Sequence, residues 1–407
     1  MERVVVTGMG AASPLGLGVE TFWERLLAGD SGVDVVQDMD LSKSGSRIGA
    51  QVRDFIPEDH FSAKEIKRLS RSTLLAILAG DEAMAGHTFP PEGAHRRGVL
   101  IGSSIAGFTA SEAHFEEFYA GPAKGNPFIV SKVMNNAPAS NLSIRYGFKG
   151  PLISTDSACA SAAHAVGYAY QSIKHGLLDT ALVGGSDSAL SPAVVQAWWR
   201  MRVLSSREDT PQEACRPFSL DRDGIVLGEG AGIMLIESER SAKARGANIL
   251  AEISGYSATS DGHHITQPSE EGPREALRLA IEDAGLSPQD IDYINAHATG
   301  TRWNDENETN VIKKVLGEHA YEIPVVGIKG AIGHSIAASG ALELVSVILS
   351  LRDQMVPPTI NLKAPDPACD LDYVSGGKRA ADIQHAASNS FAFGGSNGVL
   401  VVSRYTE

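Results

Sequence analysis

Cysteine is scarce in this sequence, which argues against a disulfide-stabilised protein and against a zinc-binding one. Only three cysteines, Cys159, Cys215 and Cys369, occur among 407 residues. Their odd number argues against a disulfide framework, and they lack the short paired spacings of a zinc site. We therefore expect neither disulfides nor a catalytic metal ion, and a protein that works in a reducing compartment.

Segments that would place the chain in or across a membrane are also missing. No stretch approaches the run of about 18 apolar residues that marks a membrane-spanning helix. Residues 1–8 begin directly in a strand-like pattern and lack the basic start and small-residue cleavage site of a secretory signal. These absences predict a cytoplasmic protein with no membrane span.

Basic residues are outnumbered by acidic ones. The chain carries 35 lysines and arginines against 49 aspartates and glutamates, a net charge of −14. This balance argues against general affinity for nucleic acid. One basic cluster, Lys64, Lys67, Arg68 and Arg71, lies on a predicted helix over residues 62–85. The cluster is either a solvated helix face or a local docking site for an acidic partner.

Glycine, in contrast, is abundant, with 42 residues, and the first glycine-rich turn follows a strand pattern. Residues 10–16 there approach the GxGxxG fingerprint of dinucleotide-binding proteins. Ser13 occupies the position of the third glycine, and Pro14 follows where the helix should already be running. The template therefore fails, and we expect no nucleotide cofactor.

Strand patterns alternate with helix patterns along the whole chain. This alternation predicts an α/β protein with largely parallel, buried sheets. The glycine-rich turn and apolar strand of residues 228–236 are paralleled by residues 394–402, and the strand–turn–helix run around Cys159 is echoed around His334. Such repetition favours two similar halves over unrelated domains. The predicted halves are residues 1–250 and 251–407.

Cys159 occupies the junction between a strand pattern, residues 151–155, and an alanine-rich helical segment, residues 160–174. Free backbone N–H groups and the helix dipole at such a junction favour negative charge, so we expect the pKa of this thiol to be lowered. Its small neighbours would let a substrate carbonyl come close. The alternative is a buried cysteine that acts as a small hydrophobe, and partner residues elsewhere decide between the two.

Three further polar residues, His297, Lys329 and His334, lie at the ends of predicted strands, where α/β proteins form their sites. A single histidine is more often a satisfied core residue, but two among small neighbours favour a site. A thiol with two imidazoles suits acyl transfer, because the sulfur can accept an acyl group and the imidazoles can donate hydrogen bonds to a developing oxyanion. A Cys–His–Asn protease would also use a cysteine and a histidine.

These residues belong to motifs that resemble a known family. The chain resembles the β-ketoacyl-acyl carrier protein synthases, elongating condensing enzymes of the thiolase-like superfamily, over residues 4–402. Each motif is weak alone, and together they are specific. The matching motifs are residues 4–10, 157–161, 222–224, 295–297, 329–334 and 389–395.

The resemblance implies a thiolase fold, with two similar halves stacked as a five-layer α-β-α-β-α structure. It implies a 3-oxoacyl-acyl carrier protein synthase in which Cys159 accepts an acyl group. His297 and His334 would drive decarboxylation of a malonyl thioester, and the resulting carbanion would attack the acyl group to give a 3-oxoacyl product and carbon dioxide. Lys329 would set the charge and position of the histidines. The N-terminal half would carry the nucleophile and the C-terminal half the His and Lys residues.

The resemblance also implies roles for the walls of the site. Backbone N–H groups of Cys159 and Phe393 would form the oxyanion hole, and Phe393 would be a gate that moves on acylation. Thr299, Thr301 and Phe391 would bind substrate along the malonyl and pantetheine entrance. Family members carry a structural ion at positions that correspond to Asn295, Glu343, Ser388 and Asn389.

An acidic acyl carrier protein that bears acyl and malonyl groups is the partner that the resemblance implies. Lys64, Lys67, Arg68 and Arg202 lie where related enzymes place their docking patch. Related enzymes are homodimers, and some polyketide versions pair with a chain-length factor. The sequence leaves the choice between these assemblies, and the length of the acyl chain, open.

Residues 297–301 read His-Ala-Thr-Gly-Thr where the family usually has His-Gly-Thr-Ser-Thr. This form resembles ketosynthases of type II polyketide systems. Fatty acid biosynthesis is the first interpretation, and a type II polyketide or polyene pathway with the same chemistry is the alternative. A degradative thiolase would need a second cysteine within residues 391–398, which has none, and a non-catalytic chain-length factor would replace Cys159.

Overall fold

The computed structural model of the protein describes residues 1–122 and 125–407, and its ten main strands form two groups. The strands of the N-terminal half are β1 (Val4–Ser13), β5 (Arg97–Gly102), β6 (Leu152–Thr155), β7 (Thr180–Ser188) and β8 (Glu229–Ser238). Those of the C-terminal half are β9 (Ala251–Ser260), β10 (Tyr293–Asn295), β11 (Val325–Val326), β14 (His385–Ala392) and β15 (Ser396–Ser403).

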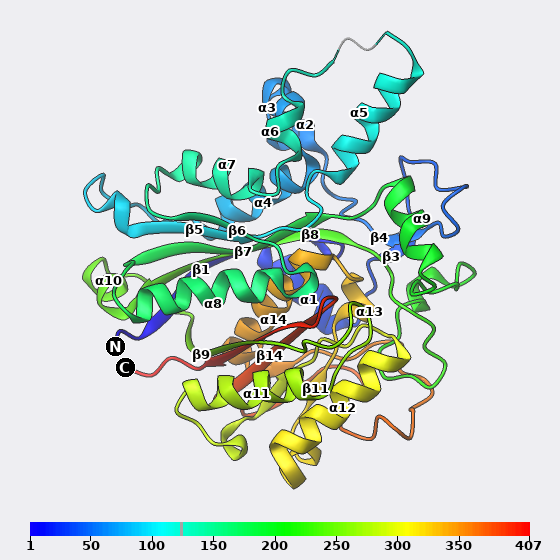
Figure 1. Ribbon diagram of the computed structural model, residues 1–407. Coiled ribbons are helices and arrows are strands. Elements are labelled where there is room, and N and C mark those ends of the chain that lie inside the picture. Colours follow the sequence, from blue (N-terminus) through cyan, green and yellow to red (C-terminus); the bar gives the residue numbers. More distant parts are fainter. Residues whose placement is uncertain (123–124) are drawn as a thin grey trace.

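All ten strands join one hydrogen-bonded path, in the order β11-β10-β14-β15-β9-β1-β8-β7-β5-β6. The two halves meet where β1 pairs with β9, and that pairing covers Val4, Val5 and Val6 alone. Beyond it the halves separate and stack over one another, as Figure 1 shows. Because β1 and β9 diverge, helices can fill the space between the two halves of the sheet.

The helices complete five layers (Figure 1). Two of them, α8 (Ser161–Lys174) and α14 (Ser339–Asp353), lie between the halves of the sheet and contact strands of both. On the outer face of the N-terminal half lie α4 (Arg71–Ala83) and α7 (Ala137–Tyr146), and on that of the C-terminal half α11 (Glu271–Asp283) and α12 (Arg302–Leu316). The predicted α-β-α-β-α order of the thiolase fold is confirmed.

The sheet is mixed, whereas the sequence favours largely parallel strands. β5 pairs in parallel with β6 and β7, and β10 with β11 and β14, but β1, β8, β9 and β15 pair antiparallel with their neighbours. The β14–β15 pair is a hairpin, and its turn needs left-handed backbone at Gly394 and Gly395, with φ of 85° and 71°. Alternating apolar runs do not report strand direction, so the prediction was wrong on this point.

The predicted helix over residues 62–85 is interrupted. It divides into α3 (Ala63–Arg68) and α4, because Ser70 takes an extended conformation and its side chain caps the Thr73 N–H. Ser62 and Glu65 form a capping box at the start of α3. The break separates Arg71 from the rest of the basic cluster, and its guanidinium pairs with the buried carboxylate of Glu229.

The glycines of β1 serve helix packing. A Cβ atom on Gly10 would lie 2.0 Å from the carbonyl oxygen of Ala79, and one on Gly8 would lie 2.1 Å from that of Ala83. Bare backbone at these positions lets α4 lie directly on the strand. The glycine-rich start that resembles a nucleotide fingerprint is therefore a helix–strand contact.

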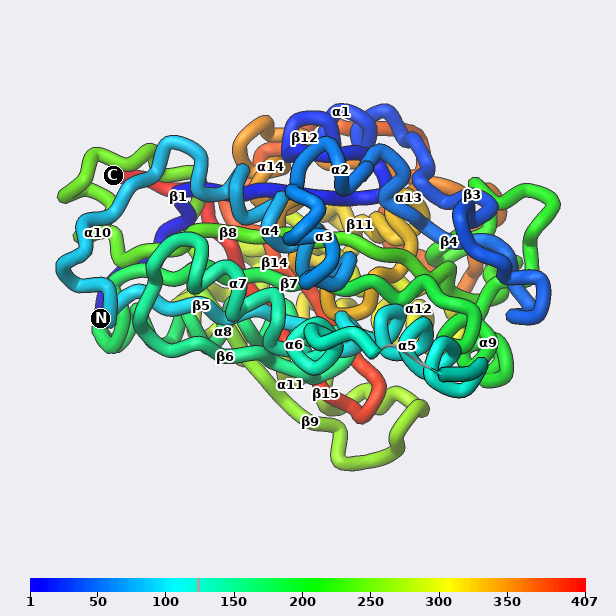
Figure 2. The backbone as a smooth tube through the Cα atoms, turned by 90° about the horizontal axis from the view of Figure 1, so that it is seen from above, coloured from blue at the N-terminus to red at the C-terminus, as the bar shows by residue number. Residues whose placement is uncertain are grey.

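The ends of the described chain lie together at one end of the molecule (Figure 2). The Arg3 guanidinium donates to the carbonyl oxygen of Thr406 at 3.2 Å and lies over the ring of Tyr405. None of the described helices combines the length and apolar composition needed to cross a membrane.

Candidate active site

Cys159 lies in a strained turn between β6 and α8. A 3₁₀ turn, η2 (Ala158–Ala160), holds it, and Ala158 takes a left-handed φ of 49°. The Ser161 hydroxyl fixes the turn, because it donates to the Ala158 carbonyl at 2.7 Å and accepts the Ser157 N–H at 2.9 Å. The thiol is buried, with 6% of Cys159 exposed.

His334 meets this thiol from the second half of the chain. It follows the short helix α13 (Lys329–Ile332), and its Nε2 atom lies 3.0 Å from Sγ of Cys159. Its Nδ1 atom lies 2.8 Å from the hydroxyl of Ser339, and its backbone N–H donates to Val226. Burial, and then the charge of Lys329, lower the pKa of His334 well below its ordinary value, so the imidazole is neutral.

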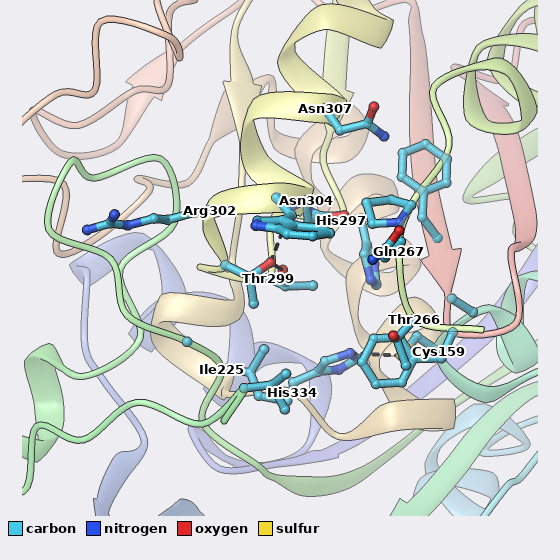
Figure 3. Close-up of a pocket in the computed structure, with 18 of the residues that line it drawn as sticks. Cys159, Ile225, Thr266, Gln267, His297, Thr299, Arg302, Asn304, Asn307 and His334 are labelled. Carbon is cyan, nitrogen blue, oxygen red and sulfur yellow. Dashed lines mark hydrogen bonds between the residues drawn. The ribbon is translucent and has the colours of Figure 1, made fainter. Parts of the chain in front are cut away.

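His297 forms the third corner of the cluster. Its ring lies 5.5 Å from that of His334, nearly perpendicular to it, and one side-chain atom each of Cys159, His297 and His334 fall within 4.8 Å of one another. The Glu308 carboxylate anchors the loop, because it accepts the backbone N–H groups of His297 and Ala298 at 2.7 and 2.8 Å. Burial, with a smaller effect of Lys329, lowers the pKa of His297 as well. Figure 3 shows the cysteine and both rings around one cavity.

Lys329 supplies positive charge beneath the two imidazoles. Its ammonium donates to the His297 carbonyl oxygen at 2.5 Å, lies 3.3 Å from Nδ1 of that ring, and pairs with the Glu343 carboxylate. Lys329 and Glu343 are fully buried. The lysine does not line the cavity, so it acts on the site through His297 and through its charge.

The expected lowering of the Cys159 pKa is not observed. Burial raises the pKa of this thiol to about 12. Lys329 and the backbone N–H groups of Cys159 and Phe393 act in the opposite direction, and burial outweighs them. The prediction recognised the N–H groups but not the depth of the site, so Cys159 is a neutral thiol hydrogen-bonded to His334.

A cavity of about 640 Å³ opens from this cluster to the surface (Figure 3). Its lining includes the four wall residues expected from the sequence, Thr299, Thr301, Phe391 and Phe393. The rings of Phe393 and Trp198 stack with their centroids 5.6 Å apart. Trp198, from α9 (Pro192–Arg200), was missed, because nothing in the sequence places α9 beside the β14–β15 turn.

Further cavity residues that the sequence analysis missed come from α12 and from the loop after β9. They include Gln267, Asn304 and Asn307. Asn304 and Asn307 are three residues apart and share one face of α12. Because Asn304 also lies three residues after Thr301, this spacing could have predicted that both asparagines line the cavity. The loop carries no comparable pattern.

The residues of the implied ion position fit a cation. Oδ1 of Asn295, Oε2 of Glu343 and Oδ1 of Asn389 are buried and find no hydrogen-bond donor among the described residues. The amide of Asn295 donates to the hydroxyl of Ser388 at 3.2 Å. Unpaired buried oxygens of this kind are the ligands that hard cations prefer.

The four predicted docking residues are divided between two places. Arg202 is exposed and lines the cavity rim, with a left-handed φ of 59°. Lys64, Lys67 and Arg68 are exposed on α3 and, in the part of the chain described, do not line the cavity. The Arg68 guanidinium lies over the ring of Phe128, so this residue already has an internal contact.

Comparisons with known proteins cover the whole chain. The family model for the beta-ketoacyl synthase N-terminal domain matches residues 1–242, and that for the C-terminal domain matches residues 250–363. The 3-oxoacyl-[acyl-carrier-protein] synthase 2 of Staphylococcus aureus (strain COL) is 41% identical over 99% of both chains. The protein of that name from Synechocystis is 40% identical over 99% of this chain and 98% of the relative.

Solved structures agree over the full length. A type II polyketide ketosynthase in complex with its acyl-carrier protein superimposes with a TM-score of 0.92 at 33% identity, and covers 100% of both chains. The ishigamide ketosynthase/chain length factor gives 0.91 at 32% identity, and a beta-ketoacyl synthase from Burkholderia phymatum STM815 gives 0.90 at 35%, both with complete coverage.

Proposed function

The chain belongs to the beta-ketoacyl synthase family and is a condensing acyltransferase, and we propose a division of its chemistry among the residues of the cavity. The observation that carries the proposal is the 3.0 Å contact between Nε2 of His334 and Sγ of Cys159, with His297 facing the same space. The substrates are acyl and malonyl groups borne as thioesters on acyl carrier protein.

Acylation of Cys159 comes first. His334 accepts the thiol proton at Nε2 while Sγ attacks the thioester carbonyl of the carrier-bound acyl group. The backbone N–H groups of Cys159 and Phe393 both favour negative charge on the sulfur, which supports assigning them as the donors to the oxyanion. The carrier C–S bond breaks, and the proton leaves on the carrier thiol.

Condensation follows on the malonyl thioester. The imidazoles of His297 and His334 donate hydrogen bonds to its thioester oxygen, the bond to the carboxylate breaks, and carbon dioxide leaves. The resulting enolate carbon attacks the acyl carbonyl on Cys159, and the sulfur departs as a thiolate when the carbon–carbon bond forms. One proton taken up from solvent restores the thiol. Both rings are neutral because of their lowered pKa, and Lys329 supplies positive potential beneath them.

A cation held by Asn295, Glu343, Ser388 and Asn389 would balance buried charge behind this site. The Glu343 carboxylate pairs with Lys329 through one oxygen, and its other oxygen, which has no hydrogen-bond donor among the described residues, would hold the ion. These residues are thereby held in place beneath His297, and no step of the reaction passes through the ion.

Mass spectrometry of the acylated enzyme tests the nucleophile directly. Incubation with acyl-carrier protein should add one acyl mass on the peptide that contains Cys159, and Cys159→Ala should gain none and form no 3-oxoacyl product. Cys369→Ser is the matched control, because that cysteine is also buried but lies outside the cavity. Full product formation by Cys159→Ala would contradict the proposal.

We assign the chain to fatty acid elongation in the cytoplasm, where its three free cysteines stay reduced. The two relatives named above, at 40% and 41% identity, support this pathway. The second candidate is a polyketide or polyene pathway, which the His297–Thr301 motif favours. Acyl groups captured on Cys159 from a panel of carrier-bound primers separate the two, because saturated chains support the first and oxo- or polyene chains the second.

The assembly we propose is a homodimer through β6. This strand ends the sheet, and its Leu152 and Ile153 are 37% and 42% exposed. Above the sheet, α5 (Phe108–Ala120) and α6 (Ile129–Val133) contact each other (Figure 1), and Phe115 and Phe118 of α5 add exposed apolar surface. An uncovered edge strand with apolar neighbours pairs readily with a second chain. Ile153→Asp should sediment as a monomer, whereas a wild-type monomer would contradict this assembly.

A further inference from the structure

Two buried serine hydroxyls stand behind His334, on the ring nitrogen that Cys159 does not use. The Ser339 hydroxyl lies 2.8 Å from Nδ1 of His334, and the Ser335 hydroxyl lies 3.3 Å from that of Ser339. Both serines are fully buried. The reaction steps above call on Nε2 alone and leave this pair without a role.

The segment that carries Ser339 back to the ring is strained and anchored. It is a 3₁₀ turn, η6 (Ile336–Ala338), and Ile336 takes a left-handed φ of 48°, a costly conformation for a β-branched residue. The buried carboxylate of Asp187 holds the turn by accepting the Ala337 N–H at 3.2 Å. This unfavourable backbone conformation brings the hydroxyl of Ser339 into contact with Nδ1 of His334.

The two half-reactions require the proton of His334 on different ring nitrogens. Acylation needs a bare Nε2 to accept the thiol proton, so the ring proton must sit on Nδ1. Decarboxylation needs a proton on Nε2 to donate to the malonyl thioester oxygen, so Nδ1 must then be bare. Burial keeps the ring neutral, and one proton therefore has to serve both arrangements.

We propose that Ser339 is a positioning residue that lets His334 serve both half-reactions, because its hydroxyl pairs with Nδ1 in either tautomer. It accepts from Nδ1–H during acylation and turns to donate to the bare Nδ1 during decarboxylation. The change of tautomer moves one proton between the two ring nitrogens, with no net gain or loss. The Ser335 hydroxyl supports the Ser339 hydroxyl from behind. This inference rests on the proposed role of His334.

Ser339→Ala removes the partner of Nδ1. Buried N–H groups without an acceptor are rarer in proteins than acceptors that lack a donor, so the variant should favour the proton on Nε2. Acylation of Cys159 should then slow on the order of tenfold, while malonyl decarboxylation stays within about twofold of wild type. Ser335→Ala should shift acylation in the same direction by a smaller factor, since among the described residues that hydroxyl contacts Ser339 alone.

Three measurements test the inference. Rapid-quench mass spectrometry follows acylation from acyl-carrier protein, and carbon dioxide release from malonyl-carrier protein without primer follows decarboxylation. Nitrogen-15 NMR of histidine-labelled enzyme, with the His334 signals assigned by their loss in His334→Ala, reads the tautomer directly. Ser346→Ala is the matched control, because Ser346 is a buried serine of α14 whose hydroxyl donates to the Glu343 carbonyl.

The possible results either support or overturn the proposed role of Ser339. Slow acylation with near-normal decarboxylation, together with a move of the proton to Nε2, supports the role of Ser339. Equal slowing of both half-reactions with an unchanged tautomer would show ordinary packing and overturn it, and so would wild-type behaviour. If His334→Ala itself leaves both half-reactions intact, the proposed function fails instead.

Discussion

Nε2 of His334 lies 3.0 Å from Sγ of Cys159, although 175 residues separate them in the chain. The thiol comes from a turn that α8 anchors in the first half, and the imidazole comes from the loop that leads into α14 in the second. Both helices lie in the central layer, so the packing in the middle of the molecule sets this contact. The proposed nucleophile and the proposed base are thus aligned before any substrate arrives.

His297→Ala should separate the two half-reactions. We expect malonyl decarboxylation to fall by roughly 10²–10³-fold, because one donor to the developing oxyanion is lost. Acylation of Cys159 should stay within a few-fold, since His334 and not His297 contacts the sulfur. Carbon dioxide release and acyl-enzyme mass spectrometry measure the two rates. His334→Ala, in contrast, should slow both, and equal effects of the two variants would contradict the assignment.

Alkylation of Cys159 should depend steeply on pH. Burial favours the neutral thiol and raises its pKa to about 12, so the thiolate fraction at neutral pH is small. At pH values below that pKa, the thiolate fraction increases about tenfold for each unit by which the pH rises. The rate of iodoacetamide labelling should increase by the same factor between pH 7 and 9. Cys159→Ala reports the background from the other two cysteines. A plateau with a midpoint near pH 7 would show instead that the N–H groups and Lys329 outweigh burial.

Charge reversal on α3 should weaken binding of the carrier protein. Lys64→Glu with Lys67→Glu should raise the KM for carrier-bound substrate roughly fivefold with little change in kcat, because exposed charges mainly steer association. We leave Arg68 unchanged because it already contacts Phe128. Lys378→Glu is the control at a distant exposed lysine. Wild-type KM values for the double variant would exclude α3 as the docking surface.

Gly10→Ala should destabilise the fold without touching the cavity. The new Cβ would lie 2.0 Å from the Ala79 carbonyl oxygen, so α4 has to shift away from β1. Overpacking of this kind costs about 1–3 kcal/mol of unfolding free energy. Urea unfolding measures the loss, and Gly376→Ala, where a Cβ meets open space, should be neutral. Equal midpoints for both variants would show that this contact yields readily.

The sequence was sufficient to predict the cluster but not its electrostatics. Cys159, His297, Lys329 and His334 each follow a strand pattern among small residues, and strand ends in an α/β fold converge, so their assembly was predictable. The pKa of Cys159 was predicted in the wrong direction, because burial depends on every layer around the site. Local sequence shows which N–H groups surround a sulfur but not how much water reaches it.

Contacts between distant segments were also beyond the sequence. The ring of Trp198 stacks on that of Phe393 and so connects α9 to the β14–β15 turn. Neither segment has a sequence pattern that predicts contact with the other. Ser339 looked like an ordinary small residue at the start of an apolar helix. Its proposed role depends on the left-handed backbone of Ile336. The conformational preferences of isoleucine do not predict that backbone conformation.

The burial that keeps Cys159 protonated also governs how the protein meets oxidants. Hydrogen peroxide attacks thiolates that it can reach, and this sulfur is mostly protonated and 6% exposed. Sulfenic acid should therefore form slowly in the resting enzyme. Acylation protects the residue further, because a thioester sulfur has no thiolate form to oxidise. If Cys159 carries acyl groups as proposed, its sulfur should be preserved under oxidative stress for as long as they occupy it.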